Sequence, residues 1–390
     1  MTRAHVHLLV AIAILFTAAI THAERAAARG PSKSCYVDSD GDGLANCVED
    51  HTGVFRSARS TGTDPHVADT DDDGISDGDE VNGTANGLNL PAMGVNPLHK
   101  DILLEYDWLN DFECGAAHSH RPTAAMLAVV RDAFASAPVE NPDGQSGIRV
   151  YQDVAPGKDG MDSGSNLVVN GAAVANGYLE GGIGSADYVN AEALNFSANR
   201  HGYFHYVIFA HGYTAAPGSS GQASIGGHRM LITLGCGYSD VNPVAYTIVH
   251  ELGHNLGLLH GGDEQCNRKP NYNSVMNYRF QFTGAMDCLQ HPLGRPDYSD
   301  GTRRPLNENG LVETDGVCQL PTTRRGPPID WNRNHVIDLN PVSHDVNFYP
   351  NSDCPGLTLL RDYDDWSHIQ LSSVRRPMSA ASEPCAPVPD

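Results

Sequence analysis

The residues with the clearest chemical potential are three histidines and a glutamate in the segment HELGHNLGLLH, residues 250–260. His250 and His254 are four residues apart, so on a helix both imidazoles project from one face. That spacing suits two nitrogen ligands of one tetrahedral zinc ion. Glu251 lies one step along the helix from His250, so its carboxylate can reach a water on the metal without ligating the ion. The segment therefore predicts a zinc site with a general base beside it.

A helix has to hold these side chains, and the flanking residues predict where it begins and ends. Asp240 and Pro243 are typical of a helix start, with a capping side chain and then proline in the first turn. Residues 244–256 are expected to be helical. Gly257 is the expected end, because a residue without Cβ permits the left-handed turn that returns the chain beneath the metal. His260 can then serve as the third ligand, which leaves a fourth position for water, as in catalytic zinc sites.

An open zinc site of this kind is suited to hydrolysis. Zinc lowers the pKa of a bound water to about 7 and polarises a carbonyl group. Glu251 can take the proton of that water and pass it to a leaving amine. The sequence therefore favours cleavage of a peptide bond, with a protein or peptide as the substrate; a non-peptide amide is the alternative.

The eleven-residue pattern resembles the signature of the metzincin metalloproteases. The segment YNSVMNY at residues 272–278 is similar to the Met-turn of that family. The resemblance implies that Met276 forms an apolar floor under the zinc ligands. It also implies that Tyr278, as in astacins and serralysins, assists the oxyanion; a buried tyrosine with a satisfied hydroxyl is the alternative. Gly261, which follows the third histidine, does not match the better-known subfamilies, so the subfamily stays open.

Two acidic loops precede this region and share one register. Each has oxygen-bearing side chains at positions 1, 3, 5, 9 and 12 of a twelve-residue loop and glycine at position 6. The first loop offers Asp38, Asp40, Asp42, Asn46 and Glu49. The second offers Asp69, Asp71, Asp73, Asp77 and Glu80. Calcium prefers several hard oxygens from a short flexible stretch, so both loops are predicted to bind structural Ca²⁺; a solvated acidic linker is the alternative.

Residues 36–82 resemble the thrombospondin type-3 calcium repeats, which implies a spacer that depends on calcium for its order. A third candidate loop lies near the C-terminus and offers Asp330, Asn332, Asn334 and Asp338. It departs from the pattern, because His335 replaces glycine at position 6 and Pro341 stands at position 12. Asp345 is a candidate replacement ligand, and an ordinary Asx-rich turn is the alternative.

Composition and charge exclude several classes of partner. The chain has 390 residues, with 47 acidic and 25 basic side chains and a net charge of −22. Nucleic-acid binding needs clustered Lys and Arg, and no basic face is available for an anionic membrane. The apolar run at residues 8–20, followed by small residues, predicts a signal peptide at 1–23 and a secreted protein without membrane insertion; a membrane tether is the alternative.

Nine cysteines in an exported protein predict disulfides. Four bridges and one remaining thiol is the simplest arrangement. Cys266 and Cys288 bracket the Met-turn segment and are a candidate pair. His201, His205, His211 and His228 could build a second metal site, but their irregular spacing gives no common face and favours ordinary histidines.

The fold class is expected to be α/β, or α+β, with a mixed twisted sheet and the zinc helix. Strands are predicted at residues 101–108, 148–152, 203–209 and 229–234, and a helix opens at Pro122. Residues 156–187 and 211–228, rich in small and polar residues, are expected to be surface loops. The metzincin resemblance adds that the strand at 229–234 is an antiparallel edge strand that pairs with extended substrate.

The domains expected are a calcium-binding repeat region at 24–97, a metzincin-like catalytic domain at 98–300 and an irregular, disulfide-stapled C-terminal subdomain at 301–390. The function expected is that of a secreted zinc endopeptidase. The alternative from another class is a calcium-dependent surface or matrix-binding protein in which the metzincin domain serves as a scaffold. The intact Glu251 and the open coordination position favour the enzyme, because binding alone requires neither.

Overall fold

The structure is a computed structural model that describes residues 33–154, 167, 177–318, 326–349, 354–375 and 380–381. Among these residues, no helix is both long and apolar enough to cross a membrane. The predicted signal peptide at 1–23 and the ninth cysteine, Cys385, lie outside the described residues.

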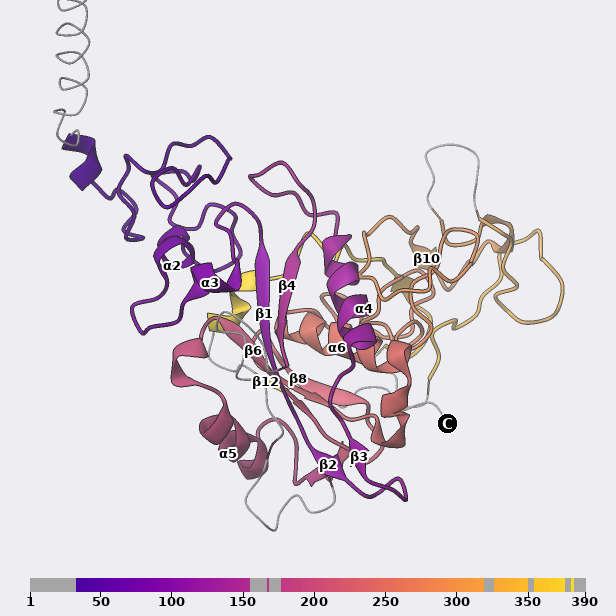
Figure 1. The fold of residues 1–390 in the computed structure, drawn as a ribbon. Coiled ribbons are helices and arrows are strands. Elements are labelled where there is room, and N and C mark those ends of the chain that lie inside the picture. Colours follow the sequence, from indigo (N-terminus) through magenta and orange to yellow (C-terminus); the bar gives the residue numbers. More distant parts are fainter. Residues whose placement is uncertain are drawn as a thin grey trace, which may run out of the picture.

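A six-stranded mixed sheet lies at the centre of the molecule (Figure 1), in the order β12-β8-β9-β6-β1-β4. Its strands are β1 (Asp101–Trp108), β4 (Arg149–Asp153), β6 (Phe204–Phe209), β8 (Gly221–Ile225), β9 (Arg229–Ile232) and β12 (Ala380–Ala381). β4, β1, β6 and β9 are parallel to one another. β8 is antiparallel to β9, and β12 is antiparallel to β8. The expected mixed α/β architecture is confirmed at this level.

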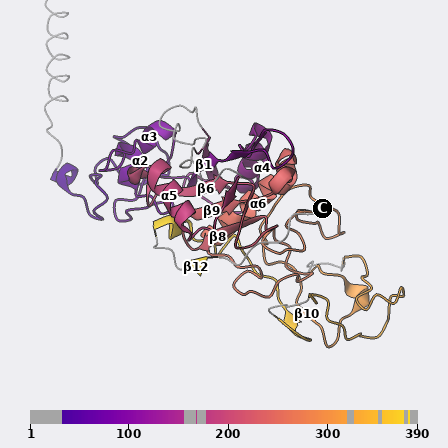
Figure 2. The ribbon, with the colours of Figure 1, turned by 90° about the horizontal axis from the view of Figure 1, so that it is seen from below.

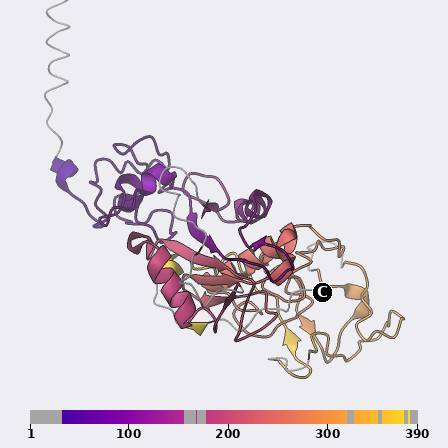
Figure 3. The ribbon, with the colours of Figure 1, turned by 60° about the horizontal axis from the view of Figure 1, so that its bottom comes forward.

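Helices cover both faces of the sheet. α4 (Ala124–Ala135) and α6 (Val241–Asn255) lie on one face and α5 (Ala186–Asn195) on the other (Figures 1 and 3). Strand β1 shows why both faces are covered: its side chains point alternately into two apolar cores, one on each face of the sheet. Ile102 and Leu104 belong to the core with α4 and α6, whereas Leu103 belongs to the core with α5. A strand buried on both faces is typical of a parallel sheet between helical layers.

The remaining elements are short. The helices are α2 (Asp77–Asn82) and α3 (Leu90–Met93), with 3-10 turns at Lys33–Tyr36, Ala198–Arg200, Gly235–Ser239, Glu313–Asp315 and Leu371–Arg375. The two-stranded ribbons pair β2 (Asn110–Asp111) with β3 (His118–Ser119), β5 (Tyr178–Leu179) with β7 (Gly212–Tyr213), and β10 (Leu306–Asn307) with β11 (Leu359–Leu360).

The acidic repeats and the segment that contains β10 lie at opposite ends of the molecule, with the sheet between them (Figures 1 and 2). The repeats are not a detached spacer, since Ile75 and Leu90 are buried in the same core as Leu103 of β1. The opposite end has a small core of its own, in which Trp331 and Leu311 pack with the disulfide cysteines.

Two expectations about the edge of the sheet are wrong. The strand predicted at 229–234 corresponds to β9, which is parallel to β6 and lies inside the sheet. The antiparallel strand next to it is β8, which lies in the segment 211–228 that was expected to be a surface loop. β8 consists of Gly, Gln, Ala, Ser and Ile, a composition that is weak in the usual strand formers. Its pairing with β9 and its burial against α6 form the strand despite that composition.

Four disulfides link Cys35 to Cys47, Cys114 to Cys236, Cys266 to Cys354 and Cys288 to Cys318. The predicted pair of Cys266 with Cys288 is wrong. Cys266 packs in the small C-terminal core with Leu360, so its partner comes from that part of the chain. Four disulfides fit an extracellular protein.

Candidate metal sites

Helix α6 carries the first two histidines, and nearly all of it is buried. Its N-cap residue Asp240 makes no side-chain capping hydrogen bond, so that detail of the prediction is wrong. The helix ends as expected, because Gly257 has a φ of 98° and its N–H donates to the carbonyl of His254. That left-handed turn reverses the chain and brings His260 back toward the helix.

The three histidines converge on one point. His254 Nε2 lies 3.2 Å from His260 Nε2, and the rings of His250 and His254 are 4.9 Å apart. The Nδ1 atoms of His250 and His254 each lie 2.8 Å from a backbone carbonyl, that of Val275 and that of Leu258. A carbonyl accepts only from a protonated Nδ1, so the Nε2 lone pairs point into the cluster, as metal ligation requires.

Burial keeps these imidazoles neutral. It lowers the pKa of His254 to about 4 and the pKa values of His250 and His260 well below their usual value, with the neighbouring histidines adding to the effect for those two. His250 Nε2 is buried and has no hydrogen-bond partner among the described residues. Three neutral, buried nitrogens that face one another form a donor set that could hold a metal ion.

The other predicted residues of this site lie directly around the histidines. Strand β8 passes over Glu251, because a Cβ on Gly221 would lie 2.5 Å from Glu251 Oε1. Met276 packs against the helix at Gly253, where a Cβ would overlap the Met276 sulfur. The ring of Tyr278 lies 4.4 Å from that of His260. Glu251, Met276 and Tyr278 are thus gathered around one cluster.

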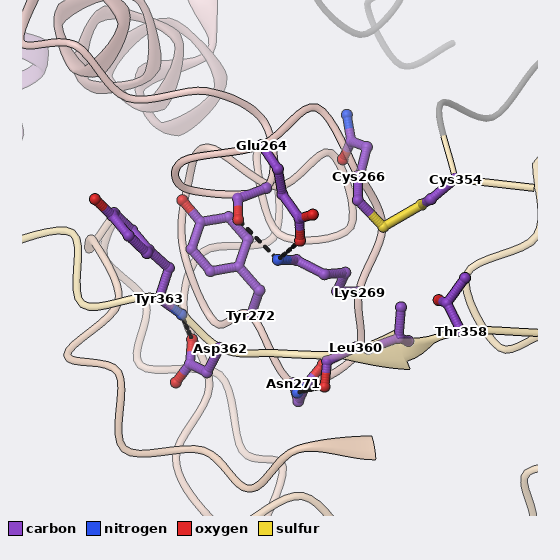
Figure 4. Close-up of polar contacts among 12 residues, drawn as sticks. Glu264, Cys266, Lys269, Asn271, Tyr272, Cys354, Thr358, Leu360, Asp362 and Tyr363 are labelled. Carbon is purple, nitrogen blue, oxygen red and sulfur yellow. Dashed lines mark hydrogen bonds and ion pairs between the residues drawn. A yellow bond between two sulfur atoms is a disulfide. The ribbon is translucent and has the colours of Figure 1, made fainter. Parts of the chain in front are cut away.

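The loop after His260 is fastened by residues that the sequence did not single out (Figure 4). Lys269, only 1% exposed, donates from Nζ to the Gly261 carbonyl at 2.7 Å and to Glu264 at 2.9 Å. Asn271 donates to the Leu360 carbonyl at 3.2 Å, and the Cys266–Cys354 disulfide joins the same two segments of the chain. These contacts hold the third histidine's loop against the C-terminal part of the chain.

The first acidic loop has the backbone of a cation-binding turn. Asp38 accepts hydrogen bonds from the N–H groups of Gly41 and Gly43 at 2.7 and 3.1 Å. Buried carboxylate oxygens without a hydrogen-bond partner among the described residues belong to Asp40, Asp42 and Glu49. Burial, together with the charges of Asp42 and Asp40, raises the pKa of Glu49 to about 7. A cation would neutralise these oxygens, which makes the group a fit for calcium.

The second acidic loop has the same backbone hydrogen bonds to its first aspartate, and its carboxylates are more deeply buried. Asp69 accepts from the N–H groups of Asp73 and Gly74 at 3.2 and 2.8 Å. Burial, together with the charges of Asp73 and Asp69, raises the pKa of Asp71 to about 10. Asp71 and Glu80 have buried oxygens without a hydrogen-bond partner within the described chain. So many buried carboxylates are costly unless a cation binds among them.

Asp101, the first residue of β1, joins this second cluster and was missed by the sequence reasoning. Its N–H donates to Asp73 Oδ2 at 2.8 Å, and its own Oδ1 is buried without a hydrogen-bond partner in the described part of the chain. Burial, and secondarily the charge of Asp73, raises its pKa well above the usual value. The loop pattern could not reveal it, because Asp101 lies outside the twelve-residue repeat.

The residues at position 9 close the two loops. Asn46 exchanges hydrogen bonds with Ser39 at 3.0 and 2.8 Å, and Asp77 accepts from the Thr70 N–H and hydroxyl at 2.9 and 2.6 Å. Both contacts join position 9 to position 2 across the loop, so these two predicted ligands also serve to close the turn.

The third candidate loop has the same turn as the first two. The residue at position 6 has a positive φ in all three loops, 97° at Gly43, 95° at Gly74 and 70° at His335. The His335 N–H donates to Asp330 at 2.6 Å, as the glycines do to the first aspartate of their loops. Asn332 and Asn334 both donate to Asp338 at 2.9 Å. The four predicted residues therefore lie together, with hydrogen bonds among their side chains.

Neither a protein family nor a curated protein matches the chain. The structure nevertheless brings together the residues of each predicted site. The zinc-site residues surround one buried cluster, and each acidic loop gathers its own carboxylates.

Proposed function

We propose that the chain is a secreted zinc endopeptidase of the metzincin type, with calcium ions that stabilise its acidic repeats. The observation that carries this proposal is the convergence of three buried, neutral imidazoles from His250, His254 and His260 beside the carboxylate of Glu251. A structural metal site would use four protein ligands, whereas this donor set has three and a general base next to it.

The proposed mechanism divides the chemistry among the residues of the cluster. A bound zinc ion would supply a Lewis acid that acidifies water and polarises the scissile carbonyl. Glu251 takes a proton from the attacking water and delivers it to the leaving amine. Tyr278, whose ring lies beside that of His260, donates a hydrogen bond to the developing oxyanion.

The substrate is proposed to lie along β8. This strand passes over Glu251, and its pairing with β9 uses Gly221, Gln222 and Ala223. β12 pairs with the other edge of β8 at Ser224 and Ile225. An extended peptide that runs along this outer edge near Gly221 would add a strand to the sheet, with affinity from backbone hydrogen bonds and selectivity from side-chain pockets.

The test of this function is cleavage of casein and of a peptide library by the zinc-loaded protein and by Glu251→Gln. The substitution keeps the size of the side chain and removes its basicity, so we expect unchanged zinc content and a fall in kcat of about 10²–10⁴-fold. Glu180→Gln, the same change at an exposed glutamate, is the matched control and should cleave like wild type.

A different result would favour the calcium-dependent surface or matrix-binding protein. The buried acidic loops suit that function equally well, since they need only calcium. It would be supported if wild type and Glu251→Gln both held zinc and neither cleaved any peptide in the library, even after proteolytic removal of residues that precede the repeats.

A further inference from the structure

A second group of metal-binding side chains lies outside the proposed catalytic cluster. It consists of Asp111 at the end of β2, His120 just after β3 and His211 between β6 and β7. The side chains of Asp111 and His120 are fully buried, and that of His211 is 11% exposed. Asp111 and His120 belong to the β2–β3 ribbon, and His211 follows about 90 residues later in the chain. All three lie at the end of the sheet where β1 and β6 finish.

The donor atoms of this group are spaced like those of the histidine cluster. Asp111 Oδ2 lies 2.6 Å from His120 Nε2 and 3.2 Å from His211 Nδ1. The second distance equals the separation of His254 Nε2 and His260 Nε2. Ligands bound at about 2.0 Å to a tetrahedral ion lie roughly 3.3 Å from one another, so the His120–Asp111 contact has to open slightly. All three donor atoms lie within 4.8 Å of one another.

Hydrogen bonds within the protein satisfy only part of this group: His120 Nε2 and Asp111 Oδ2 are hydrogen-bonded at 2.6 Å, whereas nitrogens of His118 and His211 have no hydrogen-bond partner among the described residues. His211 Nδ1 is buried near the carboxylate, yet its geometry gives it no hydrogen bond among the described residues. His118 is the residue opposite Asp111 in the β2–β3 ribbon, and its ring lies 4.6 Å from that of His120. Its Nε2 is likewise buried without a hydrogen-bond partner in the described chain. A buried polar atom of this kind calls for a ligand.

The cluster of Glu192, His228 and Arg229 also combines a carboxylate with histidine, but both of its carboxylate oxygens are satisfied by partners within the cluster. His228 Nε2 lies 2.6 Å from one oxygen of Glu192, and Arg229 donates to the other oxygen at 2.6 Å. There the carboxylate has a cationic partner and a histidine, and both contacts are complete without an ion. The Asp111 group has no arginine or lysine in ion-pair contact among the described residues. Asp111 Oδ1 accepts from the Glu113 N–H at 3.1 Å, and Oδ2 lies against the two imidazoles.

We propose that Asp111, His120 and His211 bind a second zinc ion, with His118 as the nearest candidate for the fourth ligand. Two or three neutral imidazoles and one carboxylate are a typical zinc donor set, whereas calcium takes oxygen ligands. A site closed by four protein ligands is structural and not catalytic.

The position of this site indicates what it stabilises. The His120 ring lies 4.3 Å from that of Tyr238, in the 3-10 turn that leads into α6. The Cys114–Cys236 disulfide joins the same two segments. The second zinc ion would therefore brace the β2–β3 ribbon against the entrance of the helix that carries His250 and His254.

The test is the zinc content of the purified, calcium-loaded full-length protein, measured by inductively coupled plasma mass spectrometry. We expect two zinc ions per chain in wild type and one in the double variant Asp111→Asn, His211→Ala. His254→Ala should also retain one, and the combined variant none. His228→Ala, a change in the satisfied cluster, is the matched control and should retain two. Circular dichroism and calcium binding report whether each variant is folded.

The outcomes separate this inference from the proposed catalytic site. One zinc ion in wild type that is lost in His254→Ala and kept in the double variant would overturn the second site. One zinc ion lost in the double variant and kept in His254→Ala would support the second site and contradict the catalytic one. If the double variant does not fold, His211→Ala alone is measured; a folded single variant with wild-type zinc content and unchanged resistance to chelators also overturns the proposal.

Discussion

At the scale of single residues, the candidate catalytic site depends on how its histidines are oriented and on a close contact at one glycine. The imidazoles of His250 and His254 are oriented by carbonyls of Val275 and Leu258, which lie in two different turns. Gly253 stands between these histidines, directly against the Met276 sulfur. The absence of a side chain there lets Met276 approach the helix closely between the two histidines.

Substitution of this glycine tests that close approach. In Gly253→Ala the new methyl group would overlap the Met276 sulfur and lie 3.0 Å from the Tyr298 hydroxyl. We expect a loss of about 1–3 kcal/mol in the free energy of unfolding, as for other overpacked cores, and weaker zinc binding. Urea unfolding and zinc competition with a chromophoric chelator measure the two effects.

The control for this substitution is Gly184→Ala. Gly184 has open space around its Cβ position and no positive φ, so alanine should change stability by no more than a few tenths of a kcal/mol. Equal stability and equal zinc affinity of the two variants would show that Met276 does not support the ligands in this way.

The residues predicted from the sequence are those whose partners are near in the chain. His250, His254 and His260 follow from the geometry of one helix and one turn, and the acidic loops follow from a twelve-residue register. Asp101 and Lys269 could not be predicted in the same way. Each acquires its role from a fold contact, with Asp73 in one case and with the Gly261 carbonyl in the other.

At the scale of elements, the second acidic loop is tied to the first strand of the central sheet. The N–H of Asp101, where β1 begins, donates to Asp73, and the Lys100 ammonium contacts the carbonyl of Asp71. A calcium ion in this loop would therefore order the start of β1 as well as the repeat. The same contact predicts that Asp101 contributes a calcium ligand.

Removal of that carboxylate should weaken calcium binding. In Asp101→Asn the charge is lost and the shape is kept, so we expect the second loop to bind calcium about tenfold more weakly, equivalent to ~1.4 kcal/mol. Isothermal titration with calcium, and the calcium dependence of Tm, give the measurement.

Asp72→Asn is the matched control. Asp72 lies in the same loop but is exposed, and its φ of 60° suits asparagine as well as aspartate. It should bind calcium almost like wild type. Equal affinities in the two variants would exclude Asp101 from the calcium site.

Elements were predictable where the hydrophobic pattern was strong. β1, β6 and the helices α4 and α6 lie close to their predicted ranges, because apolar residues repeat there with the period of a strand or a helix. β8 was missed, since its residues are small and polar and the strand owes its existence to its neighbours. The parallel direction of β9 was also missed, because strand direction depends on the connection through the whole fold.

At the scale of the whole molecule, the two kinds of candidate metal site occupy different places. The acidic loops of the repeats lie at one end and the third loop lies at the far end (Figures 1 and 2). His250 and His254 lie between them, on helix α6, which packs against one face of the sheet. Disulfides join segments that are far apart in sequence, among them Cys114 with Cys236 and Cys266 with Cys354. In the proposed function, calcium stabilises the fold and zinc supplies the chemistry.

The most direct test of this division is selective metal removal, with peptide cleavage and Tm measured on the same samples. Removal of zinc by 1,10-phenanthroline with calcium kept in excess should abolish cleavage, and added zinc should restore it. Removal of calcium by EGTA with zinc kept should lower Tm, since about 2.7 kcal/mol of stabilisation is lost relative to calcium at 100 times Kd. The protein that stays folded at low temperature should still cleave. Cleavage that survives the loss of zinc, or an unchanged Tm after the loss of calcium, would contradict the account.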